Sequence, residues 1–220
     1  MDINEFAQSI TVPVALCFSS RRMTGKSVML NQLMMSLVKQ EKIASVVIFS
    51  NSVKYNDDYP DFPAQCKHEY SEEKLQRLIT HQKATDKSKR KQIMVVFDDV
   101  IGDKSAQNSD LIMFAYAIGR HISINPVLVS QVSNRVLTPM VKSQSDYLFI
   151  SRLNRFQLGM IWESLTNIDK QDFIGMVEHC NKNFNFVVID NKSQSNNPEE
   201  FITIVKAKAP VAEKPENDKA

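Results

Sequence analysis

The chain has few cysteines and no long apolar run, and each shortage excludes a class of protein. Three of the 220 residues are cysteine, Cys17, Cys66 and Cys180, an odd number at wide spacing. A disulfide framework and a CxxC metal site are therefore not expected, and a reducing compartment is the expected setting. The longest apolar runs, Val12 to Phe18 and Ile93 to Phe97, fall far short of the roughly 20 residues that a membrane-spanning helix needs. We expect no membrane span.

An excess of one charge is also missing. Lys and Arg number 27 against 25 Asp and Glu, which leaves a formal net charge of +2. This balance argues against a generic basic nucleic-acid-binding protein, although a local basic face remains possible. The segment from Met1 to Glu5 has neither the basic nor the apolar region of a secretory signal, so none is expected. Hydrophobic residues make up 43% of the chain, enough for one domain with a sizeable core.

Apolar runs and helical periodicity alternate along the chain. The runs predict strands at residues 12–18, 45–50, 93–97, 122–129, 147–150, 184–190 and 201–205. Apolar residues on one helical face predict helices at residues 26–41, from residue 71 onward, around 111–118 and around 171–179. Gly119 is expected to end the third helix in a left-handed conformation, and Pro126 to lie near an edge or a bulge of the sheet.

This alternation predicts an α/β fold, because strands that alternate with helices form a mostly parallel sheet with helices on both faces. We expect a single domain over residues 1–209. Residues 210–220 are rich in Lys, Glu, Pro and Asn, and Val211 is their one large apolar residue. Such a composition predicts a disordered tail.

A phosphate-binding loop is predicted between the first strand and the first helix. Its residues are Ser20, Arg21, Arg22, Met23, Thr24, Gly25, Lys26 and Ser27, which match the Walker A pattern GxxxxGK[ST] except that Ser20 replaces the first glycine. Backbone N–H groups around Gly25 and the N-terminus of the helix would surround the phosphates of ATP. Lys26 would reach the β- and γ-phosphates, and the Ser27 hydroxyl would bind Mg²⁺. The alternative is a chance GKS sequence in a polar loop.

The serine at position 20 can replace glycine only if the position needs no positive φ, or if the loop tolerates the strain.

Two carboxylates follow the strand at residues 93–97, as in a Walker B motif. Asp98 is expected to hold Mg²⁺ through its water shell, and Asp99 to orient or deprotonate the water that attacks the γ-phosphate. Two adjacent carboxylates after five apolar residues are expensive to bury unless a cation compensates their charge. The alternative is a helix cap or a turn, because the sequence Ile101-Gly102-Asp103 is turn-like.

The strand at residues 45–50 separates the loop from the acidic pair along the chain. This order indicates a three-layer P-loop NTPase of the additional-strand, RecA-like type, rather than a nucleoside kinase or a GTPase. In such ATPases a polar residue at the end of the next strand senses the γ-phosphate, and Gln131 occupies the matching position. The alternative for Gln131 is a loop side chain exposed to water.

Together these segments resemble the genome-packaging ATPases of large double-stranded DNA viruses, which belong to the FtsK/HerA superfamily of DNA-pumping motors. The resemblance rests on residues 19–27, 95–99, 119–124 and 129–131, and it covers roughly residues 12–155. The Asp-Asp pair and the Gly-Arg-His sequence at residues 119–121 are similar to the poxvirus-type branch. Ser20 and Lys142 depart from the family pattern, where the viral proteins tend to have Gly and Arg.

The resemblance implies a ring, commonly hexameric, that uses ATP to thread double-stranded DNA into a preformed capsid. It implies a capsid or vertex protein as partner, and a location in the virion or at the assembly site in the host-cell cytoplasm. It also implies an arginine finger that reaches the neighbour's nucleotide. Arg120 is the candidate, because a guanidinium there would neutralise developing phosphoryl charge, and Arg152 and Arg155 are its rivals. The alternative for Arg120 is a cation that complements the dipole of the preceding helix.

A basic cluster before the strand at residues 93–97 is a candidate for DNA contact. It comprises Lys83, Lys87, Lys89, Arg90 and Lys91. Such a loop could touch backbone phosphates without reading bases, and the alternative is a solvated link. The predicted function is therefore an ATP-driven motor for viral DNA. A cellular or plasmid ATPase for DNA transfer or secretion stays open, as does a nucleotide-binding switch or portal component with little turnover.

Overall fold

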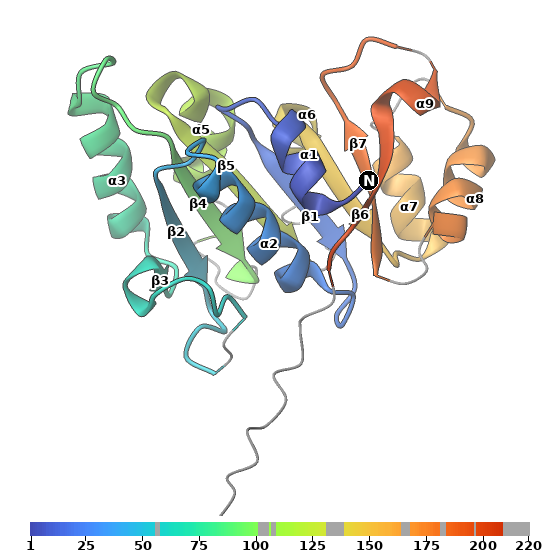
Figure 1. The fold of residues 1–220 in the computed structure, drawn as a ribbon, viewed down its shortest axis with the longest axis horizontal. Helices are drawn as coiled ribbons and strands as arrows, with labels where there is room; N and C mark the ends of the chain where they lie inside the picture. Colours follow the sequence, from blue (N-terminus) through green and yellow to red (C-terminus); the bar gives the residue numbers. More distant parts are fainter. Residues whose placement is uncertain are drawn as a thin grey trace, which may run out of the picture.

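One sheet runs through the whole molecule (Figure 1). The computed structural model describes residues 1–55, 58–100, 106, 109–130, 139–163, 168–180, 184–195 and 197–208. Within these ranges eight strands pair in the order β3-β2-β4-β5-β1-β6-β7-β8. The strands are β1 (Leu16–Ser20), β2 (Ser45–Ser50), β3 (Lys67–His68), β4 (Ile93–Asp98), β5 (Ile124–Ser130), β6 (Tyr147–Ser151), β7 (Asn185–Asp190) and β8 (Ile202–Lys206).

Helices cover both faces of this sheet. They are α1 (Ile3–Ser9), α2 (Lys26–Lys39), α3 (Glu72–Ala84), α5 (Asp110–Ile118), α6 (Pro139–Gln144), α7 (Arg155–Trp162), α8 (Lys170–Cys180) and α9 (Pro198–Phe201), with 3-10 turns η1 (Ala64–Cys66) and η3 (Gly119–Ile122). The face that carries Phe18 and Val96 packs on α1 and α2. The face that carries Cys17 and Phe97 packs on α3, α5, α6, α7 and α8. Successive side chains point to opposite faces of a strand, so buried strands supply both cores.

The carboxyl ends of the first six strands meet at one edge, because β1 to β6 all run parallel. Among the described strands only β7 runs in the opposite direction, and it pairs antiparallel with β6 on one side and with β8 on the other. The register aligns Ser50 with Asp98, and Ser20 with Ser151. The mostly parallel α/β sheet predicted from the sequence is thereby confirmed. Polar residues that follow different strands are brought to the same edge.

The first strand is shorter than predicted. It begins at Leu16 rather than at Val12, and the N–H groups of the two residues before it donate to side chains. The N–H of Val14 donates to Asn125 Oδ1 at 2.7 Å, and the N–H of Ala15 donates to Asp146 Oδ2 at 2.7 Å.

Gly119 ends α5 as its C-cap, as predicted, but the left-handed conformation predicted for it is wrong. This residue has φ −49° and ψ −38°, and the chain continues through η3 until Ser123 takes the left-handed conformation with φ +58°. Gly119 is needed for a different reason. A Cβ at this position would lie 3.0 Å from the carbonyl oxygen of Ile124, so a side chain would force η3 and the start of β5 slightly apart.

Pro126 also differs from its prediction, because it lies in β5, a central strand between β4 and β1. On the β4 side it stands opposite Val95. On the β1 side the pairing begins one residue later, with Val127 opposite Leu16. The proline therefore falls where the β1 ladder has not yet begun, which is how an interior strand accommodates a residue without an N–H.

Several short elements escaped prediction, among them α1, β3, α6, α7 and α9. They are too short for an apolar period to reveal them, although α7 has a capping box formed by Asn154 and Gln157. Within the described ranges no helix is long and apolar enough to cross a membrane. Residues 209–220 lie outside these ranges, so the domain boundary at 209 and the tail at 210–220 stay predictions.

Candidate nucleotide-binding site

The phosphate loop joins β1 to α2 at the carboxyl edge of the sheet. Gly25 is the N-cap of α2 and has φ +84°, a conformation that glycine adopts without strain. No side chain caps this helix, so its first amide groups and the positive end of its dipole are directed at the loop. This is the arrangement that binds phosphate oxygens.

The serine that replaces the first glycine of the motif fits its position. Ser20 ends β1, is fully buried, and is not among the described residues with positive φ. Its Oγ lies 2.8 Å from Oγ1 of Thr24, and that hydroxyl donates to the carbonyl oxygen of Arg21 at 2.9 Å. The two hydroxyls thus close the base of the loop with a bond that glycine cannot make. The positive φ values of the loop occur instead at Met23 (57°) and Gly25.

The ammonium group of Lys26 folds over this loop. Its Nζ lies 3.4 Å from the carbonyl oxygen of Ser20 and 3.3 Å from that of Arg21. Partial burial lowers the pKa of Lys26, while the negative charges of Asp98 and Asp99 act in the opposite direction. The lysine therefore lies between the loop and the acidic pair. A bound triphosphate would place further negative charge beside its ammonium group.

Asp98 ends β4 and is only 7% exposed. Burial raises its pKa to about 6, and the hydrogen bond from Tyr59 and the charge of Lys26 limit the rise. Tyr59 Oη donates to Asp98 Oδ2 at 2.7 Å. Asp99 follows in a turn with φ +50° and is half-buried. The two carboxylates thus have different surroundings, one buried and hydrogen-bonded, the other nearer to solvent.

These groups share one open cleft with a volume of about 870 Å³, large enough for a nucleoside triphosphate. Its lining comprises Arg22, Met23, Thr24, Gly25, Lys26, Ser27, Val28, Ser52, Tyr55, Asp58, Asp98 and Asp99. Ser20 lies beneath the loop and Arg21 is exposed beside it, and neither lines the cleft. The Ser27 hydroxyl and the Asp98 carboxylate supply the oxygen ligands that Mg²⁺ prefers, so the residues present fit the expected ion.

The sequence profile of the family described as "Poxvirus A32 protein" matches residues 7–219, nearly the whole chain. The chain belongs to the poxvirus A32 protein family. The predicted membership in the poxvirus-type branch is confirmed by this match. No curated protein sequence matches the chain.

Solved structures show the same fold. The A32-family chain is similar to the genome packaging NTPase B204 from Sulfolobus turreted icosahedral virus 2 in complex with ATP-gammaS, with 18% identity, a TM-score of 0.62, and coverage of 90% of this chain and 98% of that one. The complex of B204 with AMP gives 17% identity, a TM-score of 0.66, and coverage of 91% and 100%. The pCW3 conjugation coupling protein TcpA gives 16% identity and a TM-score of 0.54, with coverage of 80% of this chain and 56% of that one. At these identities the likeness establishes the fold, and the predicted P-loop NTPase architecture is confirmed.

Two further predicted site residues of this A32-family protein, Gln131 and Arg120, lie outside the described chain or away from the cleft. Gln131 is outside the described residues, although β5 ends beside the loop with Ser130 opposite Ser19. Arg120 lies in η3, before β5 begins, and hence at the edge of the sheet opposite the loop. There it borders a small cavity with Tyr116 and Asp146. Arg120 therefore does not share the cleft with Lys26 of the same chain.

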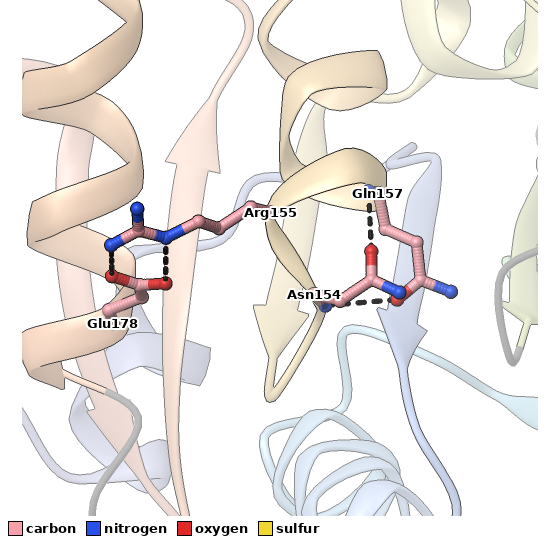
Figure 2. Close-up of polar contacts among 4 residues, drawn as sticks. All are labelled: Asn154, Arg155, Gln157 and Glu178. Carbon is pink, nitrogen blue, oxygen red and sulfur yellow. Dashed lines mark hydrogen bonds and ion pairs between the residues drawn. The ribbon is translucent and has the colours of Figure 1, made fainter.

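The rival arginines follow β6 at the loop edge. Arg155 is held by Glu178, since its Nε and one terminal nitrogen lie 2.9 and 3.0 Å from the two carboxylate oxygens (Figure 2). Arg152 has φ +49°, and its guanidinium carbon lies 5.3 Å from the centre of the Phe184 ring.

The segment after β2 supplies cleft residues that were missed in the sequence. Ser52, Tyr55 and Asp58 line the cleft, and Tyr59 contacts Asp98. Their polar segment shows no periodicity. Only the topology could have indicated these residues, because loops that follow parallel strands gather at the carboxyl edge of the sheet, where ligands bind.

Proposed function

We propose that this protein is an ATP-driven motor that moves viral double-stranded DNA into a preformed capsid. The observation that carries the proposal is the cleft that brings Lys26 of the phosphate loop together with the paired acids Asp98 and Asp99. Membership in the A32 family and similarity to structures described as a genome packaging NTPase support the same function.

In the proposed reaction the phosphates of ATP bind to the amide groups at the start of α2 and to Lys26. Ser27 and Asp98 would hold Mg²⁺, which when bound neutralises phosphate charge. Asp99 is the more accessible acid, so it would orient a water molecule in line with the γ-phosphate. The oxygen of this water forms a bond to phosphorus as Asp99 takes its proton, the bond to the bridging oxygen breaks, and ADP and inorganic phosphate leave while Asp99 returns the proton to solvent. Gln131 would sense the γ-phosphate.

A ring explains the position of Arg120. The residue lies at the edge of the sheet opposite its own cleft, so a finger role would require the cleft of a neighbouring subunit. Arg155 is less suited because Glu178 already binds its guanidinium. We therefore propose a homo-oligomeric ring, a hexamer, that docks on a capsid or vertex protein in the virion or at the cytoplasmic assembly site.

The DNA contact would lie at the same edge as Arg120. The basic cluster joins the end of α3 to the start of β4, away from the cleft. Arg90 has a structural role, since its guanidinium donates to the carbonyl oxygens of Thr85 and His121. Lys87 and Lys91 are exposed and would be free to contact backbone phosphates. ATP would thus be hydrolysed at one edge of the sheet while DNA is held at the other.

Phosphate release from ATP and Mg²⁺, with and without linear duplex DNA, tests the proposal on wild type and Lys26→Ala in parallel. A motor predicts turnover that rises with DNA and vanishes in the variant. An assembled wild-type ring without turnover would contradict the motor and favour the nucleotide-binding switch. Turnover that duplex DNA leaves unchanged would instead favour a secretion ATPase.

A further inference from the structure

An exposed aromatic ring lies against the phosphate loop on the side away from the acids. In the strand order β4-β5-β1-β6-β7, Asp98 ends a strand two places from β1 on one side, and Phe184 precedes a strand two places from β1 on the other. Because β7 is antiparallel, its start lies at the carboxyl edge of the parallel strands. Phe184 and the loop therefore share an edge although about 160 residues separate them along the chain.

The Phe184 ring contacts the loop directly. A Cβ placed on Gly25 would lie 3.3 Å from Phe184 Cδ1, so the ring packs against the α-carbon of the N-cap of α2. The guanidinium of Arg152 lies over the same ring, 5.3 Å from its centre. A phenylalanine that packs in a core is buried, yet this one is 53% exposed. The ring and the guanidinium thus form a partly solvated pair beside the helix that receives the phosphates.

Both residues also hold a costly backbone conformation, with φ +58° at Phe184 and φ +49° at Arg152. Left-handed conformations are unfavourable for residues other than glycine and cluster at ligand sites.

We propose that Phe184 and Arg152 form the platform on which the base of the bound nucleotide stacks. This inference rests on the proposed function, because it assumes that the loop holds a triphosphate. With the γ-phosphate directed at Asp99, the α-phosphate and ribose extend away from the acids, across Gly25 and towards Phe184. Phe184 lies outside the cleft lining, so in this proposal the base would extend beyond the cleft over Gly25. Aromatic rings and guanidinium groups both stack on nucleobases, whose faces are all aromatic.

Tyr55 is the competing surface, because it is 83% exposed and lines the cleft. It lies after β2, however, on the same side of the loop as the acids that would face the γ-phosphate. A base that stacked on Tyr55 would have to turn back over its own phosphates. The geometry therefore favours Phe184.

The test compares dissociation constants for ATP and for inorganic tripolyphosphate, both with Mg²⁺, by calorimetry. Phe184→Ala is expected to weaken ATP binding by about 5- to 100-fold, the range for loss of one base–aromatic stack, and to change tripolyphosphate binding less than about twofold. Arg152→Ala should likewise weaken ATP binding and leave tripolyphosphate binding nearly unchanged. Phe184→Tyr should bind ATP as the wild type does. Phe156→Ala, at a ring that is 74% exposed in α7, is the matched control and should change neither constant.

Each other outcome overturns the platform. Equal losses for ATP and tripolyphosphate in Phe184→Ala would show that the ring only supports the loop, and a loss confined to Tyr55→Ala would place the base on the other side. The proposed function is tested separately, because Lys26→Ala should weaken the binding of both ATP and tripolyphosphate. If wild type binds neither ligand, the nucleotide site and the platform both fail.

Discussion

Tyr59 Oη lies 2.7 Å from Asp98 Oδ2, and this bond joins the segment after β2 to the acid that ends β4. Both side chains are buried, Tyr59 at 2% and Asp98 at 7% exposure. The hydroxyl donates to one carboxylate oxygen and leaves the other oxygen without this contact. Tyr59 therefore fixes how the carboxylate of Asp98 is presented to the cleft.

Replacing Tyr59 by Phe should lower the free energy of unfolding by about 1–2 kcal/mol, because a buried carboxylate loses a hydrogen bond. It should also weaken the binding of Mg²⁺ and ATP together, since the carboxylate is free to rotate. Urea unfolding and calorimetry measure the two effects. Tyr70→Phe is the matched control. Its buried hydroxyl donates to Ser109 Oγ at 2.7 Å, away from the cleft, so a similar loss of stability with unchanged ligand binding is expected. Equal ligand affinity in both variants would contradict the role of Tyr59.

Asp99→Asn should leave ATP bound and slow its hydrolysis by at least about 100-fold, because an amide cannot act as a base towards water. Lys26→Ala should lose binding as well. Equilibrium binding and single-turnover phosphate release separate the two defects. A fully active Asp99→Asn protein would remove this residue from the mechanism.

The two ends of the phosphate loop should respond differently to substitution. Gly25→Ala should lose stability by about 1–2 kcal/mol and bind ATP poorly, because the position has φ +84°. Ser20→Gly restores the motif but removes the bond to Thr24. We therefore expect it to lower stability by about 1 kcal/mol without raising turnover. Thermal unfolding and phosphate release on both variants check this contrast, and faster turnover in Ser20→Gly would show that the serine impairs the loop.

The finger role of Arg120 predicts complementation between subunits. Arg120→Ala rings should be inactive, and so should Asp99→Asn rings, but mixed rings should recover part of the DNA-stimulated turnover. Arg155→Ala serves as the control, because its guanidinium is engaged by Glu178, and it should retain turnover. Mixed rings without recovery would assign Arg120 to capping the preceding helix.

Cys17 should resist thiol reagents. Burial raises its pKa from 9.0 to about 12, which reduces the reactive thiolate at pH 8 by about a thousandfold, and the side chain is also inaccessible. Reactivity should rise only well above pH 9 or on unfolding. Mass spectrometry after timed alkylation of native and urea-unfolded protein measures the difference, with the half-buried Cys66 as the internal comparison. Rapid labelling of Cys17 in the native protein would contradict its burial.

The sequence alone determined the elements whose signals are local. The helix that follows the loop and the predicted strands at 45–50 and 93–97 match the structure closely, because each consists of a long apolar period or a continuous apolar run. The GKS sequence between a strand and a helix placed the loop, and parallel strands carried Asp98 and Asp99 to the same edge. Ser71 was expected to start a helix, and its side chain does cap α3.

Tertiary structure decided everything that depends on contacts between distant segments. The order of strands placed Pro126 in the interior of the sheet, and the approach of Ile124 determined the role of Gly119. The contacts of Tyr59 with Asp98 and of Phe184 with Gly25 join segments about 40 and 160 residues apart. No periodicity encodes such pairs, because they arise only when the register of the sheet and the packing of its loops bring unrelated stretches of chain to one edge.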